Sequence, residues 1–233
     1  MSKIVLSLML SVLSASAQLS TAVRELGDGR SEVTITSTSG VPLEAFVATW
    51  ITPEPSGGHR SFHNDALLLA AFKTLPTTFV VGSADTQVQV HGIFQDDSTY
   101  GDPQWIEGLR KHRIYYLQAL DAFLAELRTA SPTTSPVGLV QQLSETRDRL
   151  IAAAKNTIQS PNSETPSFSD MFSRDAPGRG IRSVYTFLVR NITKPPAQPN
   201  GAAMALPDVL TLLTDLLSAQ RSKVAPHVAS NIK

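Results

Sequence analysis

The chain has 233 residues, of which 42% are hydrophobic and 17% charged, a composition that supports a folded core and excludes an intrinsically disordered protein. Its 20 basic and 20 acidic residues cancel and form no basic cluster, so we do not expect nucleic acid as a partner. The chain has no cysteine, which excludes a disulfide framework, a thiolate zinc site and a thiol nucleophile.

The first 17 residues, MSKIVLSLMLSVLSASA, have the pattern of a secretory signal peptide. Lys3 gives a positive start, residues 4–13 are an apolar stretch, and Ala15 and Ala17 are small residues of the kind that signal peptidase requires. The stretch is too short for a membrane helix, which needs about 20 apolar residues. We therefore expect a secreted or periplasmic mature chain that begins at Gln18 and has no later membrane span. The alternative interpretation is an amphipathic or core helix, because serines recur there at helical spacing.

Residues 18–102 have the pattern of a small antiparallel β-sandwich. Residues 31–38 and 43–52 alternate apolar and polar side chains, as half-buried strands do. Ser39 and Gly40 lie between them as a turn signal. These two segments therefore predict a β-hairpin.

Three later segments complete the predicted β domain. Residues 66–72 are an apolar run that suits either a buried strand or a helical turn. Residues 77–81 are rich in β-branched side chains, and residues 86–94 begin with strict alternation. Short strands separated by glycine and proline turns are typical of a sandwich.

Beyond residue 102 the hydrophobic period becomes helical, and residues 103–233 are expected to form a helical region. The clearest element is a long helix over residues 103–129, with an apolar stripe along one face. Asp102 is its expected N-cap, with Pro103 at the first helical position.

The rest of this region is less regular. Residues 137–158 and 208–220 predict further helices, and residues 180–193 suit a helix or a strand. Residues 174–182 (RDAPGRGIR) are expected to be an exposed basic loop. The whole pattern predicts an α+β fold in which a small sandwich packs with the long helix and a helical C-terminal region.

The segment DDSTYGDPQWIE, residues 96–107, contains oxygen ligands at the spacing of a calcium loop. Asp96 is at position 1, Ser98 at position 3, Gly101 at position 6 and Glu107 at position 12, and Asp102 lies between them. The alternative is a turn that leads into a capped helix, which would explain the same aspartates and the glycine.

The segment GGHRSFHND, residues 57–65, is expected to be a loop that carries His59, His63 and Asp65. Imidazole and carboxylate are suitable ligands for zinc or another transition metal. The segment lacks the HExxH pattern, so no glutamate base accompanies the histidines. The alternative is a solvated polar loop without a metal.

Two parts of the β half are similar to known exported proteins. Residues 33–46 (VTITSTSGVPLEAF) resemble the opening hairpin of secreted bacterial β-sandwich domains. Residues 88–101, followed by a long Arg-bearing helix, resemble an arrangement found in exported bacterial proteins. The resemblance implies an Ig-like sandwich followed by helices in an exported protein, and it implies no catalytic residues.

We therefore expect a non-catalytic interaction or envelope-associated module that takes a partner protein through a sheet edge or a helix face. The alternative is a metal-binding protein or metal-dependent hydrolase, without another cofactor, that uses His59, His63 and Asp65 or residues 96–107. This alternative depends on whether the two segments meet at one end of the sheet. A third possibility is a carrier of an apolar ligand, with the helices covering a cavity.

Overall fold

The computed structural model of the chain describes residues 19–26, 30–37, 41–53, 59–67, 77–82, 87–131, 133–157, 167–197 and 202–229. Within these residues, the strands precede residue 103 and the helices follow it, so the fold is α+β, as the sequence predicts. The predicted signal peptide, residues 1–17, lies outside the described residues.

The strands form two antiparallel sheets, with the orders β1-β2-β5 and β4-β3-β6-β7. Their bounds are β1 Leu19–Glu25, β2 Arg30–Ser37, β3 Leu43–Pro53, β4 His59–Leu67, β5 Thr77–Gly82, β6 Gln87–Phe94 and β7 Thr99–Tyr100.

The predicted hairpin between β2 and β3 is wrong, because these strands belong to different sheets. β2 lies between β1 and β5, and β3 lies between β4 and β6. The inward side chains Val33 and Ile35 of β2 are fully buried, and Ile35 packs in the same cluster as Phe46 of β3. The chain therefore crosses from one sheet to the other, which lets both apolar faces be buried against each other.

Four helices follow, and their bounds are α1 Pro103–Thr129, α2 Pro136–Thr157, α3 Phe168–Thr193 and α4 Leu206–Ala229. α1 has the bounds expected from its apolar stripe. α3 begins with a capping box made by Ser167 and Asp170. It contains residues 174–182, so the prediction of an exposed loop there is wrong, even though Pro177 lies inside the helix. α4 is also longer than the expected segment 208–220.

Among the described residues, buried hydrophobic side chains form three clusters. One lies between the two sheets and includes Leu19 and Phe46. A second lies between the β4-β3-β6-β7 sheet and the helices, where Val47 meets Trp105 and Phe172. The third fills the interior of the helix bundle. The β4-β3-β6-β7 sheet is thus covered on one face by the other sheet and on the opposite face by α1 and α3.

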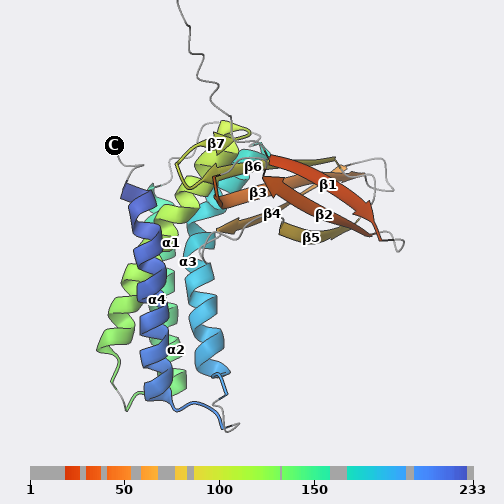
Figure 1. Ribbon diagram of the computed structural model, residues 1–233. Coiled ribbons are helices and arrows are strands. Elements are labelled where there is room, and N and C mark those ends of the chain that lie inside the picture. The colour runs from red at the N-terminus through yellow and green to blue at the C-terminus, as the bar shows by residue number, and fades with distance from the viewer. Residues whose placement is uncertain are drawn as a thin grey trace, which may run out of the picture.

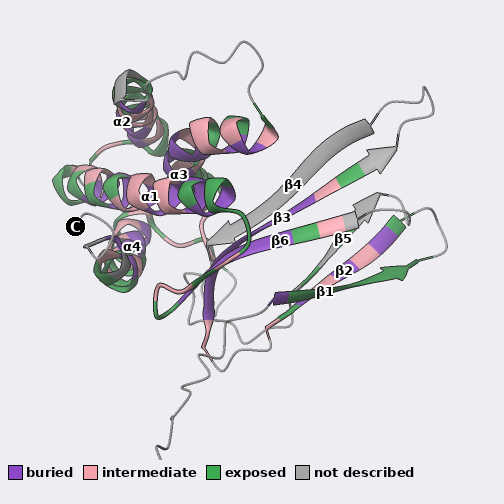
Figure 2. Cartoon of the chain, turned by 90° about the horizontal axis from the view of Figure 1, so that it is seen from above, coloured by how far each residue is buried: buried purple, intermediate pink, exposed green. Residues whose placement is uncertain are grey.

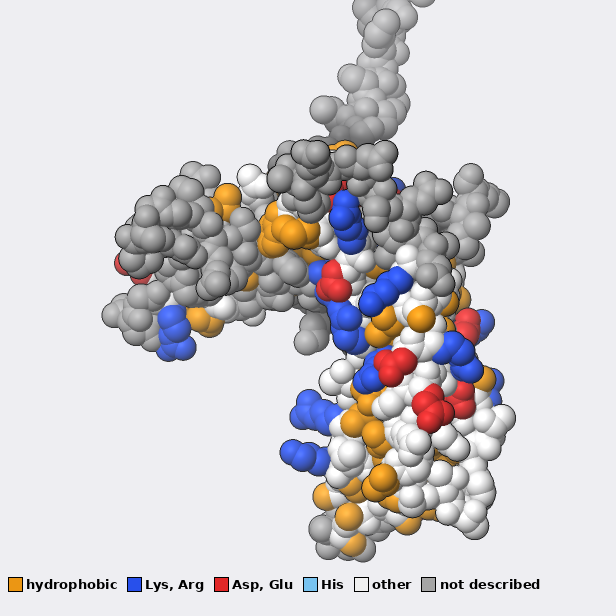
Figure 3. Space-filling view, turned by 180° about the vertical axis from the view of Figure 1, so that it is seen from behind, with side chains coloured by type: hydrophobic (Ala, Val, Ile, Leu, Met, Phe, Trp, Pro, Cys, Tyr) orange, Lys and Arg blue, Asp and Glu red, His pale blue; other side chains and the backbone are white. Residues whose placement is uncertain are grey.

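The sheets project sideways from one end of the helix bundle (Figure 1). Burial along β3 falls with distance from the helices (Figure 2). Val47 is fully buried, whereas the side chain of Ile51, further along the strand, is 53% exposed. On the face shown in Figure 3, basic and acidic side chains are interspersed along the helices. None of the described helices has the length and apolar character needed to cross a membrane.

Candidate functional site

The acidic residues of the predicted calcium segment take part separately in a hairpin turn, a helix cap and an ion pair. Asp96 accepts the backbone N–H of Ser98 at 3.0 Å and its hydroxyl at 2.5 Å, and these bonds lower the pKa of Asp96. Asp102 is the N-cap of α1 and accepts a backbone N–H of the first turn at 2.7 Å, as predicted. Glu107 lies in α1, 3.7 Å from Nζ of Lys111. No group of three or more potential metal ligands occurs among the described residues.

The predicted histidine loop is wrong, because its described residues, 59–65, belong to strand β4 at the edge of the β4-β3-β6-β7 sheet. His59 pairs with Pro53 of β3, His63 with Thr49 and Asp65 with Val47. The side chains of the three predicted ligands lie outside the described part of the molecule.

His59 and the turn that carries Asp96 lie at opposite ends of β3. Leu43, at the start of the strand, pairs with Phe94, which lies just before Asp96, whereas Pro53, at the end, pairs with His59. An 11-residue strand spans roughly 35 Å. His59 and Asp96 therefore do not share a site, and the metal alternative loses the convergence on which it depended.

A different feature stands out at the other edge of this sheet, where β7 is only two residues long. β7 pairs with Gly92 and Ile93 of β6. The chain then turns away at Gly101, whose φ of 102° favours glycine, and Pro103 begins α1. Among the described residues, no strand pairs with residues 87–91 on this side of β6.

The hydrogen bonds at the end of β6 show which backbone groups face the open edge. Phe94 donates its N–H at 2.9 Å to the carbonyl just before β7, and Gln95 donates at 2.9 Å to the carbonyl just before β3. Because these directions alternate along a strand, Val88 and Val90 point their N–H and C=O groups to the same side as Phe94. The open edge therefore presents backbone donors and acceptors to an added strand.

This edge lies in a groove of about 480 Å³ between β1 and β6. β1 forms one side of the groove, and β7 with the following glycine closes one end. The lining residues are uncharged or carry a histidine, and they are Leu19, Thr21, Val88, Gln89, Val90, His91, Tyr100 and Gly101.

His91 joins this groove to the start of α1. Its Nδ1 accepts the backbone N–H of Asp102 at 2.9 Å, so the neutral ring carries its proton on Nε2. The ring stacks on Trp105, with centroids 5.6 Å apart and planes inclined by 8°. Burial lowers the pKa of His91, and the carboxylate of Asp102 partly opposes this effect. The imidazole is thus held neutral and acts as an acceptor that fixes the helix start.

A buried ion pair also links α1 to β3. Arg113 of α1 donates to Glu44 of β3, and the two residues are only 3% and 4% exposed. Asp97, in the β6–β7 turn, lies 4.0 Å from the same guanidinium. Burial lowers the pKa of Arg113, and the two carboxylates counter that effect. The sequence gives little signal for this pair, because Glu44 lies in an apolar strand pattern and Arg113 in a helix with other basic residues.

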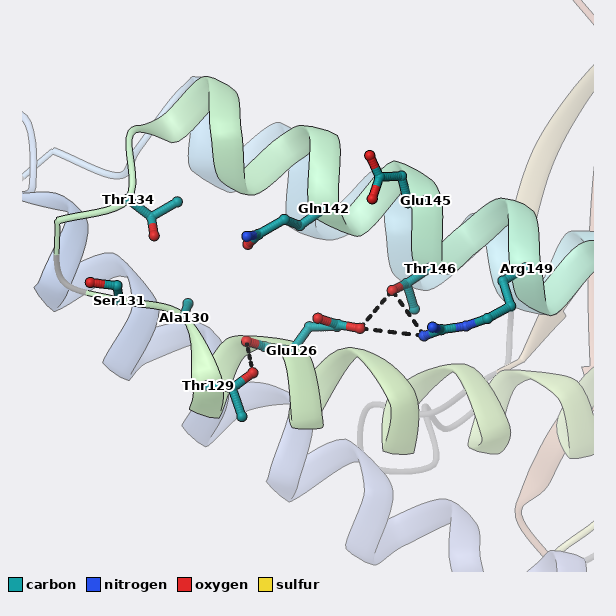
Figure 4. A pocket seen from close by; sticks show the side chains of 9 residues that line it. All are labelled: Glu126, Thr129, Ala130, Ser131, Thr134, Gln142, Glu145, Thr146 and Arg149. Atoms are coloured by element: carbon teal, nitrogen blue, oxygen red, sulfur yellow. Dashed lines mark hydrogen bonds and ion pairs between the residues drawn. The ribbon is translucent and has the colours of Figure 1, made fainter.

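A second, polar groove of about 500 Å³ lies between the end of α1 and the start of α2 (Figure 4). Side chains of the two helices bind one another in this groove. Thr146 donates to Glu126 at 2.7 Å, and Arg149 lies 3.4 Å from the same carboxylate oxygen. These contacts link α1 to α2, which is a structural role.

Comparisons of the chain with models of protein families, with curated proteins and with solved structures give no match. The functional argument therefore depends on the described geometry, in which the open edge of β6 is one of several sheet edges and lies in a groove.

Proposed function

We propose that the protein is a non-catalytic interaction module that binds a partner protein through an edge of its sheets. The observation that carries this proposal is the open edge of β6 beside the two-residue strand β7. Such edges are templates for strand addition, and proteins without a partner usually block them. The expected export to a secreted or periplasmic location is part of the same proposal.

We further propose that the two sheets form an Ig-like β-sandwich. The first, second and fifth strands share one sheet, and the fourth, third, sixth and seventh share the other. In the constant-type Ig domain the first, second and fifth strands also share one sheet and the third, sixth and seventh the other, so the arrangement differs in the fourth strand, which here pairs with the third. The apolar cluster shared by the two sheets supports this assignment.

The metal-dependent hydrolase has less support than the interaction module. Asp96 and Asp102 each accept hydrogen bonds that define a turn and a helix cap, and Glu107 lies beside Lys111. A metal would have to compete with these contacts at each position.

Site-specific photo-crosslinking tests the interaction role. A photoreactive residue is placed at Thr21, in the groove, or at Thr211, an exposed position of α4, in cells that produce the full chain. A protein captured from Thr21 but not from Thr211, which then binds the purified chain in stoichiometric amounts by calorimetry, supports binding at the sheet edge. A partner captured only from Thr211 would move the interaction to a helix face. If neither position captures a protein that binds the purified chain, the interaction role is wrong.

A further inference from the structure

We propose that the groove between β1 and β6 receives a single extended peptide segment without charged side chains, supplied by a partner protein and added to β6 as a strand. This inference rests on the interaction role proposed above and names the kind of partner. The segment would pair with the part of β6 that has no strand beside it among the described residues once β7 ends.

The backbone N–H and C=O groups of β6 suit a peptide in the extended conformation. Val88 and Val90 direct their N–H and C=O groups into the groove, two residues apart, which is the repeat of a β-ladder. Neither residue has a strand partner on that side among the described residues. The open stretch, residues 87–91, spans about 16 Å, enough for five residues of an added strand.

The shape of the groove favours one chain over the edge of another sheet. Leu19 and Thr21 of β1 line one side, and Tyr100 and Gly101 close the end next to β7. The edge of β6 therefore lies in a groove that residues of β1 and β7 line. We propose a single strand as the occupant because β1 lies beside this edge, where a whole second sheet would also have to fit.

The residues that line the groove determine which side chains an occupant can carry. Among the described residues, no Lys, Arg, Asp or Glu lines the groove, and His91 is held neutral by its hydrogen bond and its burial. A charged side chain that became buried there would lose its hydration and would meet no described lining residue of opposite charge. Val88 and Leu19 face the space between the sheets, while Gln89 lies on the opposite face of β6. The occupant should therefore alternate apolar and uncharged polar residues.

The test selects peptides from a library of random phage-displayed segments against the full chain and then measures the affinity of a selected synthetic peptide by fluorescence anisotropy. We expect uncharged sequences with alternating apolar residues. Val88→Pro removes an outward N–H without touching the pairing with β3, and should weaken binding about tenfold or more. Val88→Ala, which keeps that N–H, is its matched control and should bind nearly as the parent does.

A second pair of variants tests the charge argument independently of β6. Thr21→Lys places a charge in the groove, and Ser20→Lys places the same charge on the other face of β1. We expect the first to abolish binding and the second to leave it unchanged, with circular dichroism and thermal unfolding used to confirm that every variant is folded.

Several results would overturn the inference. Selected peptides that are charged, or that bind all four variants equally, would place the site elsewhere. Recovery of no binding peptide would remove the groove as a site. A dimer of the free chain, seen in sedimentation and dissociated by Val88→Pro, would identify a second copy as the occupant. A partner captured from Thr211 together with failure of the peptides would remove the groove and leave the interaction role intact.

Discussion

The guanidinium of Arg113 lies in the interior with the carboxylate of Glu44 as its hydrogen-bonded partner, so this ion pair links α1 to β3 without access to solvent. We predict that Arg113→Met lowers the free energy of unfolding by about 3–5 kcal/mol, because it leaves a buried carboxylate without its cation. The double variant Glu44→Leu with Arg113→Met should recover most of this loss, because apolar residues can replace a buried pair. Urea denaturation measures the free energy of unfolding of both variants. A double variant as unstable as Arg113→Met alone would contradict the prediction.

His91 gives the protein a dependence of stability on pH with a defined sign. Its pKa is lowered in the folded state by burial, so the unfolded chain binds the proton more readily. The stabilising effect is therefore complete above the unfolded pKa of about 6.5 and is lost as the pH falls from there to the lower pKa of the folded state. Protonation of Nδ1 would also remove the acceptor used by Asp102.

The matched variant for this prediction is His91→Asn, which keeps an acceptor but cannot titrate. We expect the free energy of unfolding of the parent to fall more steeply between pH 7.5 and pH 5 than that of the variant, because other histidines contribute equally to both. Urea titrations at several pH values measure the difference. Parallel curves would show that His91 does not couple protonation to folding.

At the scale of the elements, Gly180 sets the distance between α1 and α3. A Cβ at this position would lie 2.8 Å from the carbonyl oxygen of His112 and 2.8 Å from the backbone nitrogen of Tyr116, and neither atom can move without the helix. We predict that Gly180→Ala lowers the free energy of unfolding by about 1–3 kcal/mol, although alanine has the higher helix propensity. Gly138→Ala is the control, since its Cβ would meet only side-chain atoms of the preceding turn, the nearest at 3.3 Å, and it should be neutral or stabilising. Equal effects of the two substitutions in thermal unfolding would contradict this account.

The sequence predicts the elements better than their partners. The helix from Pro103 and its cap at Asp102 are confirmed because both depend on local periodicity and on a local hydrogen bond. β1 escapes prediction because all but its first residue are exposed and show no alternation of burial. The sequence predicts a loop for the segment that contains His59 and His63, because its residues are mostly polar. The segment is an edge strand instead, because it pairs with β3, and this non-local contact cannot be read from the local pattern.

The candidate groove could not be predicted from the sequence for the same reason. The alternating pattern of residues 86–94 predicts the strand β6. For residues 96–107 the sequence leaves two interpretations, and the turn that leads into a capped helix is the one that the structure shows. What the sequence does not show is that β7 ends after Tyr100, with Leu19 of a separate sheet beside the edge that this leaves open. That arrangement follows from how the two sheets pack, which depends on residues far apart in the chain.

At the scale of the whole molecule, the sheets and the bundle are joined through α1, which contributes to the bundle interior and to the cluster against β3. Phe172 of α3 lies at the centre of this junction. It is 2% exposed, its ring centroid lies 4.8 Å from that of Trp105, and the guanidinium of Arg179 lies 3.8 Å above its ring. Because both parts bury the same cluster, we expect the chain to unfold in one cooperative transition.

The final prediction concerns this coupling. Phe172→Ala should lower the free energy of unfolding by about 3–5 kcal/mol and loosen the sheets from the bundle, so tryptophan fluorescence, which reports Trp50 and Trp105, should change before the helical circular dichroism signal. Leu217→Ala is the control, because it is equally buried but lies in the bundle cluster, and it should shift both signals together. If the two signals still coincide in Phe172→Ala, the sheets are held to the bundle chiefly by other contacts, and the ion pair between Glu44 and Arg113 becomes the main link between them.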